Sequence, residues 1–250
     1  MPVVVADARA DFERLVQCLT ARNELEIVPP GMGACLVSGL VNWDRVRRHE
    51  AAWRAAHPTA DEADWQEEWR RFSSDRAAYQ DRVLLLGTGP YSGIRPAGID
   101  PAEWLVRSLV IRREHECTHY ATFRAYGVVR THVFDEILAD FIGLLRAFGR
   151  YDGALARQIL GIDAAGRRLG GRLENYRGTP PLSEAAFDVV AVLAARATAA
   201  LESAWDSAGA AVTNGVLVRW VRVLCELPLD AIGSPALAAA LAADGEGAAR

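Results

Sequence analysis

The sequence predicts a mainly α-helical protein of the α+β class with a small sheet near its N-terminus. Two observations carry this prediction: apolar residues recur at helical spacing over most of the chain, and short β-branched runs lie within residues 1–40. The 250 residues are 51% hydrophobic and 24% charged, a composition typical of a globular chain that can bury a core. We find no internal repeat and no linker, so we expect a single domain over residues 1–250.

The first 40 residues are expected to supply the sheet. Val3–Val5 is a short β-branched run, and a helical pattern follows over residues 8–22. Two further strands are predicted at residues 25–28 and 34–37, because prolines and glycines bound both segments.

The next segment is expected to be helical from residue 42 to about residue 85. Trp65, Trp69 and Phe72 recur at i, i+4 and i+7, which predicts an apolar stripe that packs in a core. Residues 86–100 are rich in Gly and Pro and are expected to form a loop beside the functional site.

A long helix is predicted to follow this loop. Asp100 can serve as its N-cap, Pro101 fits the first helical position, and Glu103 can complete a capping box. The helix is expected to run to Tyr126 and to stop at Gly127.

A second helix is predicted over His132 to Phe148, with Thr131 as its cap and Gly149 as its end. The turn between the two helices is short, so they should lie antiparallel.

The last hundred residues are expected to add helices to this pair. Residues 150–182 suggest a helix followed by a loop, and Ser183 to Ser207 predicts an Ala-rich helix. Residues 216–227 are expected to form a buried segment, and the pattern fits either a helix or a strand. The end of the chain, from about residue 238 to 250, is expected to be frayed.

Composition excludes several classes of function. The formal net charge of −4 argues against a broad nucleic-acid-binding face, because such binding depends on neutralising phosphates. All 28 basic residues are Arg, and a chain without Lys cannot be a pyridoxal enzyme or a P-loop NTPase.

The chain is expected to be soluble and cytoplasmic. No uninterrupted apolar stretch approaches the length of about 18 residues that indicates a membrane span. The four cysteines are scattered without metal-binding or disulfide-rich spacing, which fits a reducing compartment. We therefore expect no nucleic-acid or membrane partner, and the sequence leaves the oligomeric state open.

The most informative segment is REHECTHY, which contains His115, Glu116 and His119 as an HExxH motif. On a helix, residues four apart lie on one face, so both imidazoles can bind one metal ion. Glu116 is turned about 100° around the helix from His115 and can lie where a water on that metal would be.

A second pattern lies downstream in DEILAD. Glu136 and Asp140 are also four residues apart and share a face. In an antiparallel hairpin, residues equally far from the turn lie at the same level, which pairs His119 with Glu136 and His115 with Asp140 around Gly127. The two pairs are therefore in register.

This register predicts a metal site. Glu136 can be the third metal ligand, and Asp140 can accept a hydrogen bond from the outer ring nitrogen of His115. Three protein ligands leave a fourth position open, as a catalytic zinc requires. We expect one Zn²⁺ per chain, with iron as the alternative.

The segment from His115 to Asp140 resembles the gluzincin branch of the zinc metallopeptidases, in which an HExxH helix is followed by an ExxxD helix. The resemblance implies a zincin-like helical core, zinc bound by His115, His119 and Glu136, and Glu116 as general base. The interval between the two motifs is shorter than in that branch, and an Asp stands before Glu136 where thermolysin-like enzymes have Asn. The wider strings also resemble uncharacterised bacterial proteins.

A further donor is expected to stabilise the oxyanion during hydrolysis. His132 is the first candidate, because it lies one helical turn before Glu136 on the same face. Tyr126 and Tyr151 are weaker candidates.

The leading functional hypothesis is a zinc-dependent hydrolase of peptide or amide bonds. A tailoring enzyme of small-molecule metabolism that uses the same ligands for cyclisation, elimination or iron-dependent oxidation is the alternative. A non-catalytic zinc-binding regulator is the second alternative.

Overall fold

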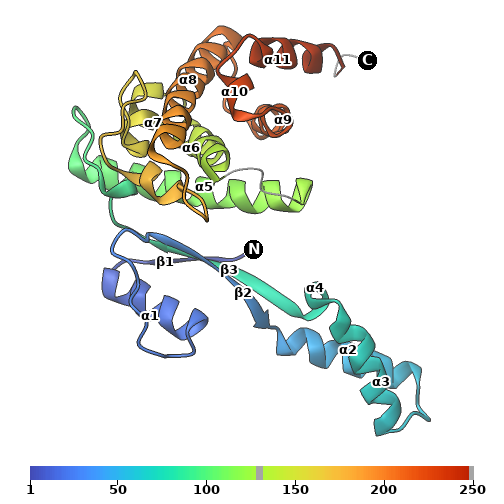
Figure 1. Ribbon diagram of the computed structural model, residues 1–250. Helices are drawn as coiled ribbons and strands as arrows, with labels where there is room; N and C mark the ends of the chain where they lie inside the picture. Colours follow the sequence, from blue (N-terminus) through green and yellow to red (C-terminus); the bar gives the residue numbers. More distant parts are fainter. Residues whose placement is uncertain (128–131, 248–250) are drawn as a thin grey trace. The chain divides into compact units, whose positions relative to one another are not determined.

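The computed structural model describes residues 1–127 and 132–247, apart from the side chains of residue 132 and residues 245–247 (Figure 1). It divides into two compact units, Met1–Gly87 and Thr88–Arg250, and each has its own hydrophobic core. The chain is mainly helical with one three-stranded sheet, which confirms the predicted fold class. The single domain over residues 1–250 stays a prediction.

The first unit contains the sheet. β1 (Val3–Ala6) lies parallel to β3 (Gln80–Gly87), and β2 (Ala34–Val41) pairs with β3 in the antiparallel sense, so β3 is the central strand. The amphipathic helix α1 (Arg9–Thr20) buries Phe12 in the core formed with this sheet. This arrangement confirms the predicted N-terminal sheet.

Two expectations for the first unit are wrong. Residues 25–28 form no strand, because the backbone oxygens of Glu26 and Val28 accept hydrogen bonds from side chains of α1, and Leu25 is 94% exposed. The helical pattern expected to reach about residue 85 ends at Tyr79, and the buried run from Val83 to Leu86 belongs to β3. A short apolar run of this kind fits a buried helix and a central strand equally well.

The helices between β2 and β3 are α2 (Trp43–Ala56), α3 (Glu62–Ser74) and α4 (Arg76–Tyr79). The predicted aromatic stripe of α3 packs against rings of α2. The ring of Trp65 lies 5.6 Å from that of Trp53, and Phe72 stacks on His49 at 3.9 Å. The stripe is therefore a packing surface, as predicted.

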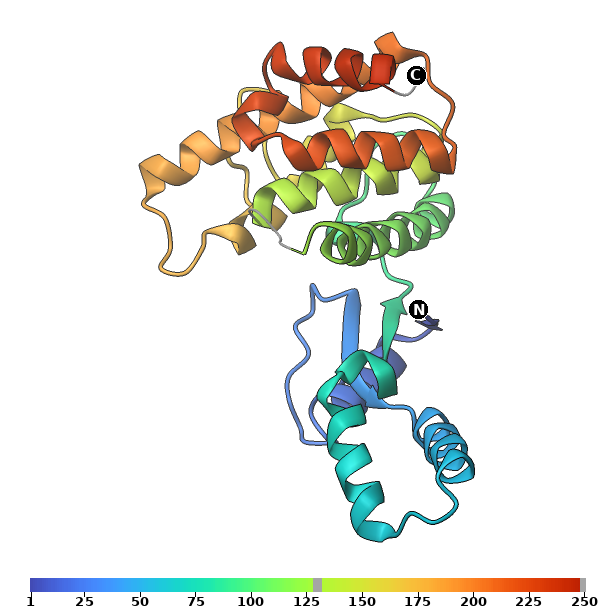
Figure 2. The ribbon, with the colours of Figure 1, turned by 90° about the vertical axis from the view of Figure 1, so that its right-hand side faces the viewer.

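The second unit is a bundle of helices built around α6 (His132–Phe148). Figure 2 shows α6 between α5 (Pro101–Tyr126) and α9 (Asn214–Glu226), and α6 also contacts α7 (Gly153–Leu160) and α8 (Glu184–Ala208). The other described elements are η1 (Tyr91–Gly93), η2 (Arg172–Tyr176), α10 (Leu229–Ile232) and α11 (Ala236–Gly247). The apolar face of α6 is buried at Ile137, Phe141, Leu144 and Leu145.

α5 and α6 have the bounds that the sequence predicts. The Asp100 carboxylate accepts hydrogen bonds from the backbone N–H groups of Ala102 and Glu103, so it caps α5. The capping box is incomplete, because the Glu103 carboxylate pairs with Arg107 instead. α5 ends at Gly127, whose φ of 72° lies in the left-handed region that favours glycine.

α5 and α6 approach each other closely at Gly143. A Cβ atom at this position would lie 2.9 Å from the backbone oxygen of Ile111, so the helices come this near because residue 143 has no side chain. The pairing determines which residues of the two helices face each other. Thr131, the predicted cap of α6, lies outside the described residues.

The C-terminal helices differ from expectation in one place. The predicted Ala-rich helix is α8, which the Ser183 hydroxyl caps, and the segment for which helix and strand stood open is the helix α9. The end of the chain, expected to fray from about residue 238, forms α11 through residue 247. Leu237 is buried in the core and Asp244 lies 2.8 Å from Arg219 of α9, so both kinds of contact hold this helix in place.

Candidate metal centre

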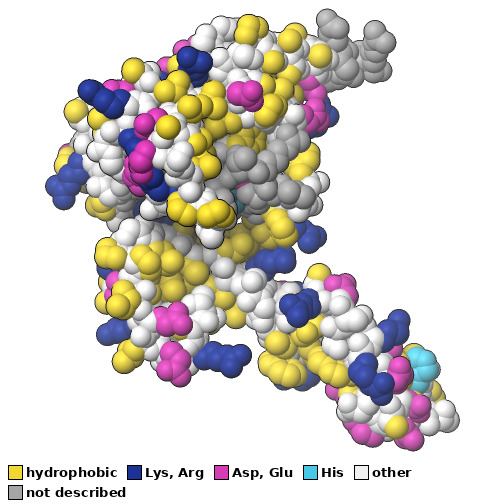
Figure 3. Space-filling view, viewed as in Figure 1, with side chains coloured by type: hydrophobic (Ala, Val, Ile, Leu, Met, Phe, Trp, Pro, Cys, Tyr) yellow, Lys and Arg dark blue, Asp and Glu magenta, His cyan; other side chains and the backbone are white. Residues whose placement is uncertain are grey.

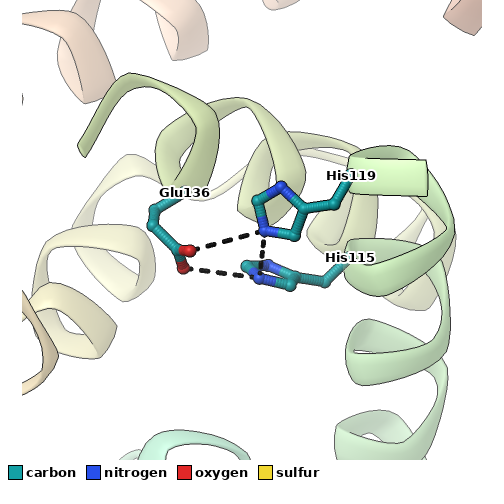
Figure 4. A group of neighbouring side chains, drawn as sticks. All are labelled: His115, His119 and Glu136. Carbon is teal, nitrogen blue, oxygen red and sulfur yellow. Dashed lines mark hydrogen bonds and ion pairs between the residues drawn. The ribbon is translucent and has the colours of Figure 1, made fainter. Parts of the chain in front are cut away.

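Two histidines of α5 turn their rings toward the same point. His115 and His119 are four residues apart on one helix face, and their Nε2 atoms are 2.9 Å apart (Figure 4). The His115 side chain is buried, whereas that of His119 is 27% exposed. The pair therefore has one ring in the interior of the unit and one that solvent can reach.

Glu136 of α6 completes the group. Its Oε2 atom lies 3.4 Å from Nε2 of His115, and its Oε1 atom lies 3.4 Å from Nε2 of His119 (Figure 4). The three ligand atoms all lie within 4.8 Å of one another. His115, His119 and Glu136 can therefore bind one metal ion, as the sequence analysis predicts.

Asp140 lies on the outer side of His115. Its Oδ1 atom is 2.9 Å from Nδ1 of His115, and both side chains are buried. A carboxylate at this position keeps a proton on Nδ1 and orients the Nε2 lone pair toward a metal. The pairs His115–Asp140 and His119–Glu136 are those that the register of the hairpin predicts.

Tyr91 and Arg172 also reach the site, and the sequence analysis did not single them out. The Tyr91 hydroxyl lies 2.6 Å from Oδ1 of Asp140 and 2.8 Å from Nδ1 of His115. The Arg172 guanidinium donates to the Tyr91 hydroxyl at 2.6 Å and to Oδ2 of Asp140. Its Nη2 atom also lies 3.6 Å from Oε2 of Glu136. Both residues come from 3₁₀ turns that lie far along the chain from the HExxH motif.

The two carboxylates stay ionised because of their partners. Burial alone would raise the pKa of Glu136, but hydrogen bonds to His115 and His119 and the charge of Arg172 lower it strongly. Burial would likewise raise the pKa of Asp140, and the Arg172 charge and the His115 hydrogen bond lower it. The site thus contains two negative charges one helical turn apart on α6, one buried at Asp140 and one on Glu136, whose side chain is 13% exposed.

The donor set fits a bound cation. Burial would lower the pKa of His115, yet its hydrogen bonds to Asp140 and Glu136 raise it to about 9. Without a metal, a proton on Nε2 is what allows this ring to approach the Glu136 carboxylate. A metal ion takes the place of that proton, because both bind the same lone pair. Two imidazole nitrogens and a carboxylate oxygen are ligands that Zn²⁺ accepts.

The two predicted catalytic residues have different outcomes. Glu116 follows His115 on α5 and is half-buried, and no hydrogen bond or ion pair joins its carboxylate to another residue in the described ranges. His132 begins α6, but its side chain lies outside the described residues. Its role as an oxyanion donor therefore stays a prediction.

Tyr176 lies closer to the ligands than the two weaker tyrosine candidates. Burial together with the nearby charge of Glu136 raises the pKa of its hydroxyl. Tyr126 lies at the far end of α5, and Tyr151 packs on Phe141 at 4.9 Å. The sequence offers no signal for Tyr176, because it lies in the segment expected to be a loop and matches no motif.

The predicted loop after residue 86 does lie beside the site, and α5 anchors it. Arg112 is buried and donates hydrogen bonds to the backbone oxygens of Gly89, at 3.0 Å, and Pro90, at 3.4 Å. Its guanidinium lies 5.8 Å from the centre of the Tyr91 ring. The Ser108 hydroxyl accepts a hydrogen bond from the Tyr91 backbone N–H at 2.9 Å. These contacts hold the Tyr91 side chain against His115.

The surface and the helices give two further observations. On the face drawn in Figure 3, Arg side chains are interspersed with Asp and Glu side chains. Among the described residues, no helix combines the length and apolar character needed to cross a membrane.

Comparison with known proteins gives one match. The model of DUF7005, a family of unknown function, matches residues 1–236, which include all of the first compact unit and most of the second. No curated protein and no solved structure matches the chain. The resemblance to gluzincins stays a prediction.

Proposed function

We propose that this chain, which belongs to the family DUF7005, is a cytoplasmic zinc-dependent hydrolase that cleaves peptide or amide bonds. The observation that carries the proposal is the convergence of two imidazole nitrogens and one carboxylate oxygen from His115, His119 and Glu136. Three protein ligands without cysteine are typical of catalytic zinc sites, whereas structural sites commonly have four ligands rich in Cys. The four cysteines are free thiols, which fits a reducing compartment.

Each residue of the site has a role in this proposal. His115, His119 and Glu136 would hold the zinc ion, which when bound would supply Lewis-acid chemistry to a substrate carbonyl and lower the pKa of a water. Glu116 accepts a proton from that water and passes it to the leaving amine. Asp140 orients the His115 ring, and the half-buried Tyr176 hydroxyl donates to the charge that develops on the substrate oxygen.

Access to solvent supports a catalytic role over a purely regulatory one. His119 and Glu136 are 27% and 13% exposed, whereas His115 and Asp140 are buried. One side of the ligand group is therefore accessible to solvent. A zinc site that serves stability alone has no need of such an opening.

The ligand set also favours a second candidate function. Two His and one carboxylate are the ligands of non-haem iron oxygenases as well as of zinc hydrolases. A tailoring enzyme of small-molecule metabolism could use His115, His119 and Glu136 for cyclisation, elimination or iron-dependent oxidation. The metal in the purified protein distinguishes this candidate from the hydrolase.

A substrate screen tests the proposal. The full-length chain is purified without added metal, analysed for zinc and iron, and incubated with a library of blocked peptides and small amides, with cleavage read by mass spectrometry. We expect zinc-dependent cleavage that falls about 10²–10⁴-fold in Glu116→Gln, because this change removes the general base and leaves the metal ligands intact.

Glu103→Gln is the matched control, because Glu103 is an exposed carboxylate of α5 that pairs with Arg107 of the same helix. It should keep full activity. Iron in the purified protein together with no cleavage of any library member would overturn the hydrolase proposal in favour of oxidative chemistry.

A further inference from the structure

Tyr91 and Arg172 join two distant turns of the second unit to the metal ligands. Tyr91 belongs to η1 and lies 24 residues before His115, and Arg172 belongs to η2 and lies 32 residues after Asp140. The Tyr91 side chain is buried and that of Arg172 is 13% exposed. Folding therefore places two polar side chains in the interior next to the ligands, at a desolvation cost that only specific contacts can offset.

Together with His115, these side chains use both oxygens of Asp140. Oδ1 of Asp140 lies 2.9 Å from Nδ1 of His115 and 2.6 Å from the Tyr91 hydroxyl, and Oδ2 accepts from Arg172. Rotation of the Asp140 carboxylate would break the hydrogen bonds at both of its oxygens. The orientation of Asp140, and through it that of the His115 ring, is therefore held from outside the HExxH helix.

Arg172 also lies directly beside the candidate metal ligand Glu136. Its Nη2 atom contacts Oδ2 of Asp140 and lies 3.6 Å from Oε2 of Glu136, the oxygen that faces Nε2 of His115. One guanidinium thus bridges a metal ligand and the carboxylate that orients a second ligand. It also supplies positive charge between two carboxylates that lie one helical turn apart on α6.

We propose that Tyr91 and Arg172 are positioning residues of the metal centre, which set its metal affinity by fixing the orientation of Asp140, His115 and Glu136. The inference rests on the metal site of the proposed function and extends it to residues outside the HExxH and DEILAD motifs. Both residues act through the ligands and need no contact with a substrate.

Three variants test this inference. Tyr91→Phe removes the hydroxyl and keeps the ring, and Arg172→Lys keeps the charge and removes the planar fork that reaches two carboxylates. Arg172→Gln removes the charge as well. Loss of an outer partner of a metal ligand typically weakens metal binding about 10–100-fold, so we expect the loss to grow in the order Tyr91→Phe, Arg172→Lys, Arg172→Gln.

Two control variants keep the metal contacts intact. Tyr151→Phe changes another buried tyrosine of the same unit, whose hydroxyl has no hydrogen-bond partner within the described ranges. Arg177→Gln changes an arginine five residues after Arg172, which pairs with Glu174 and Glu184. Both controls should bind zinc as the wild type does.

The measurement is Zn²⁺ affinity of the metal-free full-length chain, by competition with a chromophoric chelator, with circular dichroism to establish that each variant is folded. The absorption spectrum of the Co²⁺-loaded protein gives a second readout, which changes with ligand geometry and not with fold stability alone. The inference is overturned if Tyr91→Phe and Arg172→Lys fold and have the same zinc affinity and Co²⁺ spectrum as Tyr151→Phe. This outcome can be read even if Arg172→Gln does not fold.

The outcome for the wild type separates this inference from the proposed function. A wild-type chain that binds no zinc overturns both. A wild-type chain that binds zinc, with variants that bind it equally well, overturns the positioning role alone and leaves the metal site standing.

Discussion

Oδ1 of Asp140 lies 2.9 Å from Nδ1 of His115, although the two residues are 25 positions apart and belong to different helices. This contact and the approach of Glu136 to His119 follow from one antiparallel pairing of α5 with α6. The geometry of the metal ligands therefore depends on how these two helices pack, as well as on the HExxH motif itself.

Asp140→Asn is expected to weaken zinc binding about 10–100-fold without removing a ligand. The amide keeps the shape of the side chain, but its NH₂ group replaces one accepting oxygen, so the hydrogen bond from either His115 or Arg172 is lost. Chelator competition measures the affinity. Asp188→Asn is the control, since Asp188 is an exposed carboxylate that pairs with Arg168, and equal losses in both variants would contradict this role for Asp140.

Gly143→Ala is expected to lower both the free energy of unfolding, by about 1–3 kcal/mol, and the affinity for zinc. The new Cβ atom would lie 2.9 Å from the backbone oxygen of Ile111, so α5 and α6 must move apart. Urea unfolding and zinc titration measure the two effects.

Gly215→Ala is the matched control for Gly143→Ala. A Cβ at Gly215 of α9 meets no atom within 4 Å, and alanine is the better helix former. This variant should be as stable as the wild type or more so, with unchanged zinc affinity. If Gly143→Ala has the same stability and zinc affinity as Gly215→Ala, the close contact between α5 and α6 does not determine the geometry of the metal ligands.

The stability of the metal-free protein is expected to depend on pH through His115. Its pKa is raised from 6.5 to about 9 in the folded chain, so the charged ring stabilises the fold fully below pH 6.5. That contribution is lost as pH rises toward 9, because the folded protein must then release the proton. The difference in unfolding free energy between wild type and His115→Gln should shrink across this range by up to about 3 kcal/mol. A difference that stays constant from pH 6 to 9 would contradict this assignment.

Zinc binding is expected to release a proton near neutral pH. His115 must give up the proton on Nε2 before that nitrogen can bind a metal, so zinc affinity should fall about tenfold for each pH unit below 9. Calorimetric titration in buffers of different ionisation enthalpy counts the protons released. An affinity that does not change with pH between 6 and 8 would rule out His115 as a ligand.

The helices of the site could be predicted from the sequence because their ends have local signals. Asp100 and Pro101 mark the start of α5, and Gly127 marks its end in the left-handed conformation that favours glycine. Once both helices were placed, the turn between them determined which residues of the two helices lie at the same level. The pairs His115–Asp140 and His119–Glu136 then followed from helix geometry alone.

The residues that surround the ligands could not be predicted in this way. Tyr91, Arg172 and Tyr176 lie in 3₁₀ turns, and long-range packing of the second unit brings them to the ligands. The central strand was missed for a related reason. The run from Val83 to Leu86 shows no alternation, because its residues are all buried, and its pairing partners lie 46 to 81 residues away.

The zinc content of the purified chain tests the metal centre most directly. The full-length protein and a His115→Ala/His119→Ala variant are loaded with zinc, separated from free metal by gel filtration, and analysed for bound zinc per chain. We expect one zinc per wild-type chain and none on the folded variant, because the variant keeps only one of the three ligands. A folded wild-type chain that retains no zinc, or a variant that retains as much as the wild type, would contradict the assignment of this site.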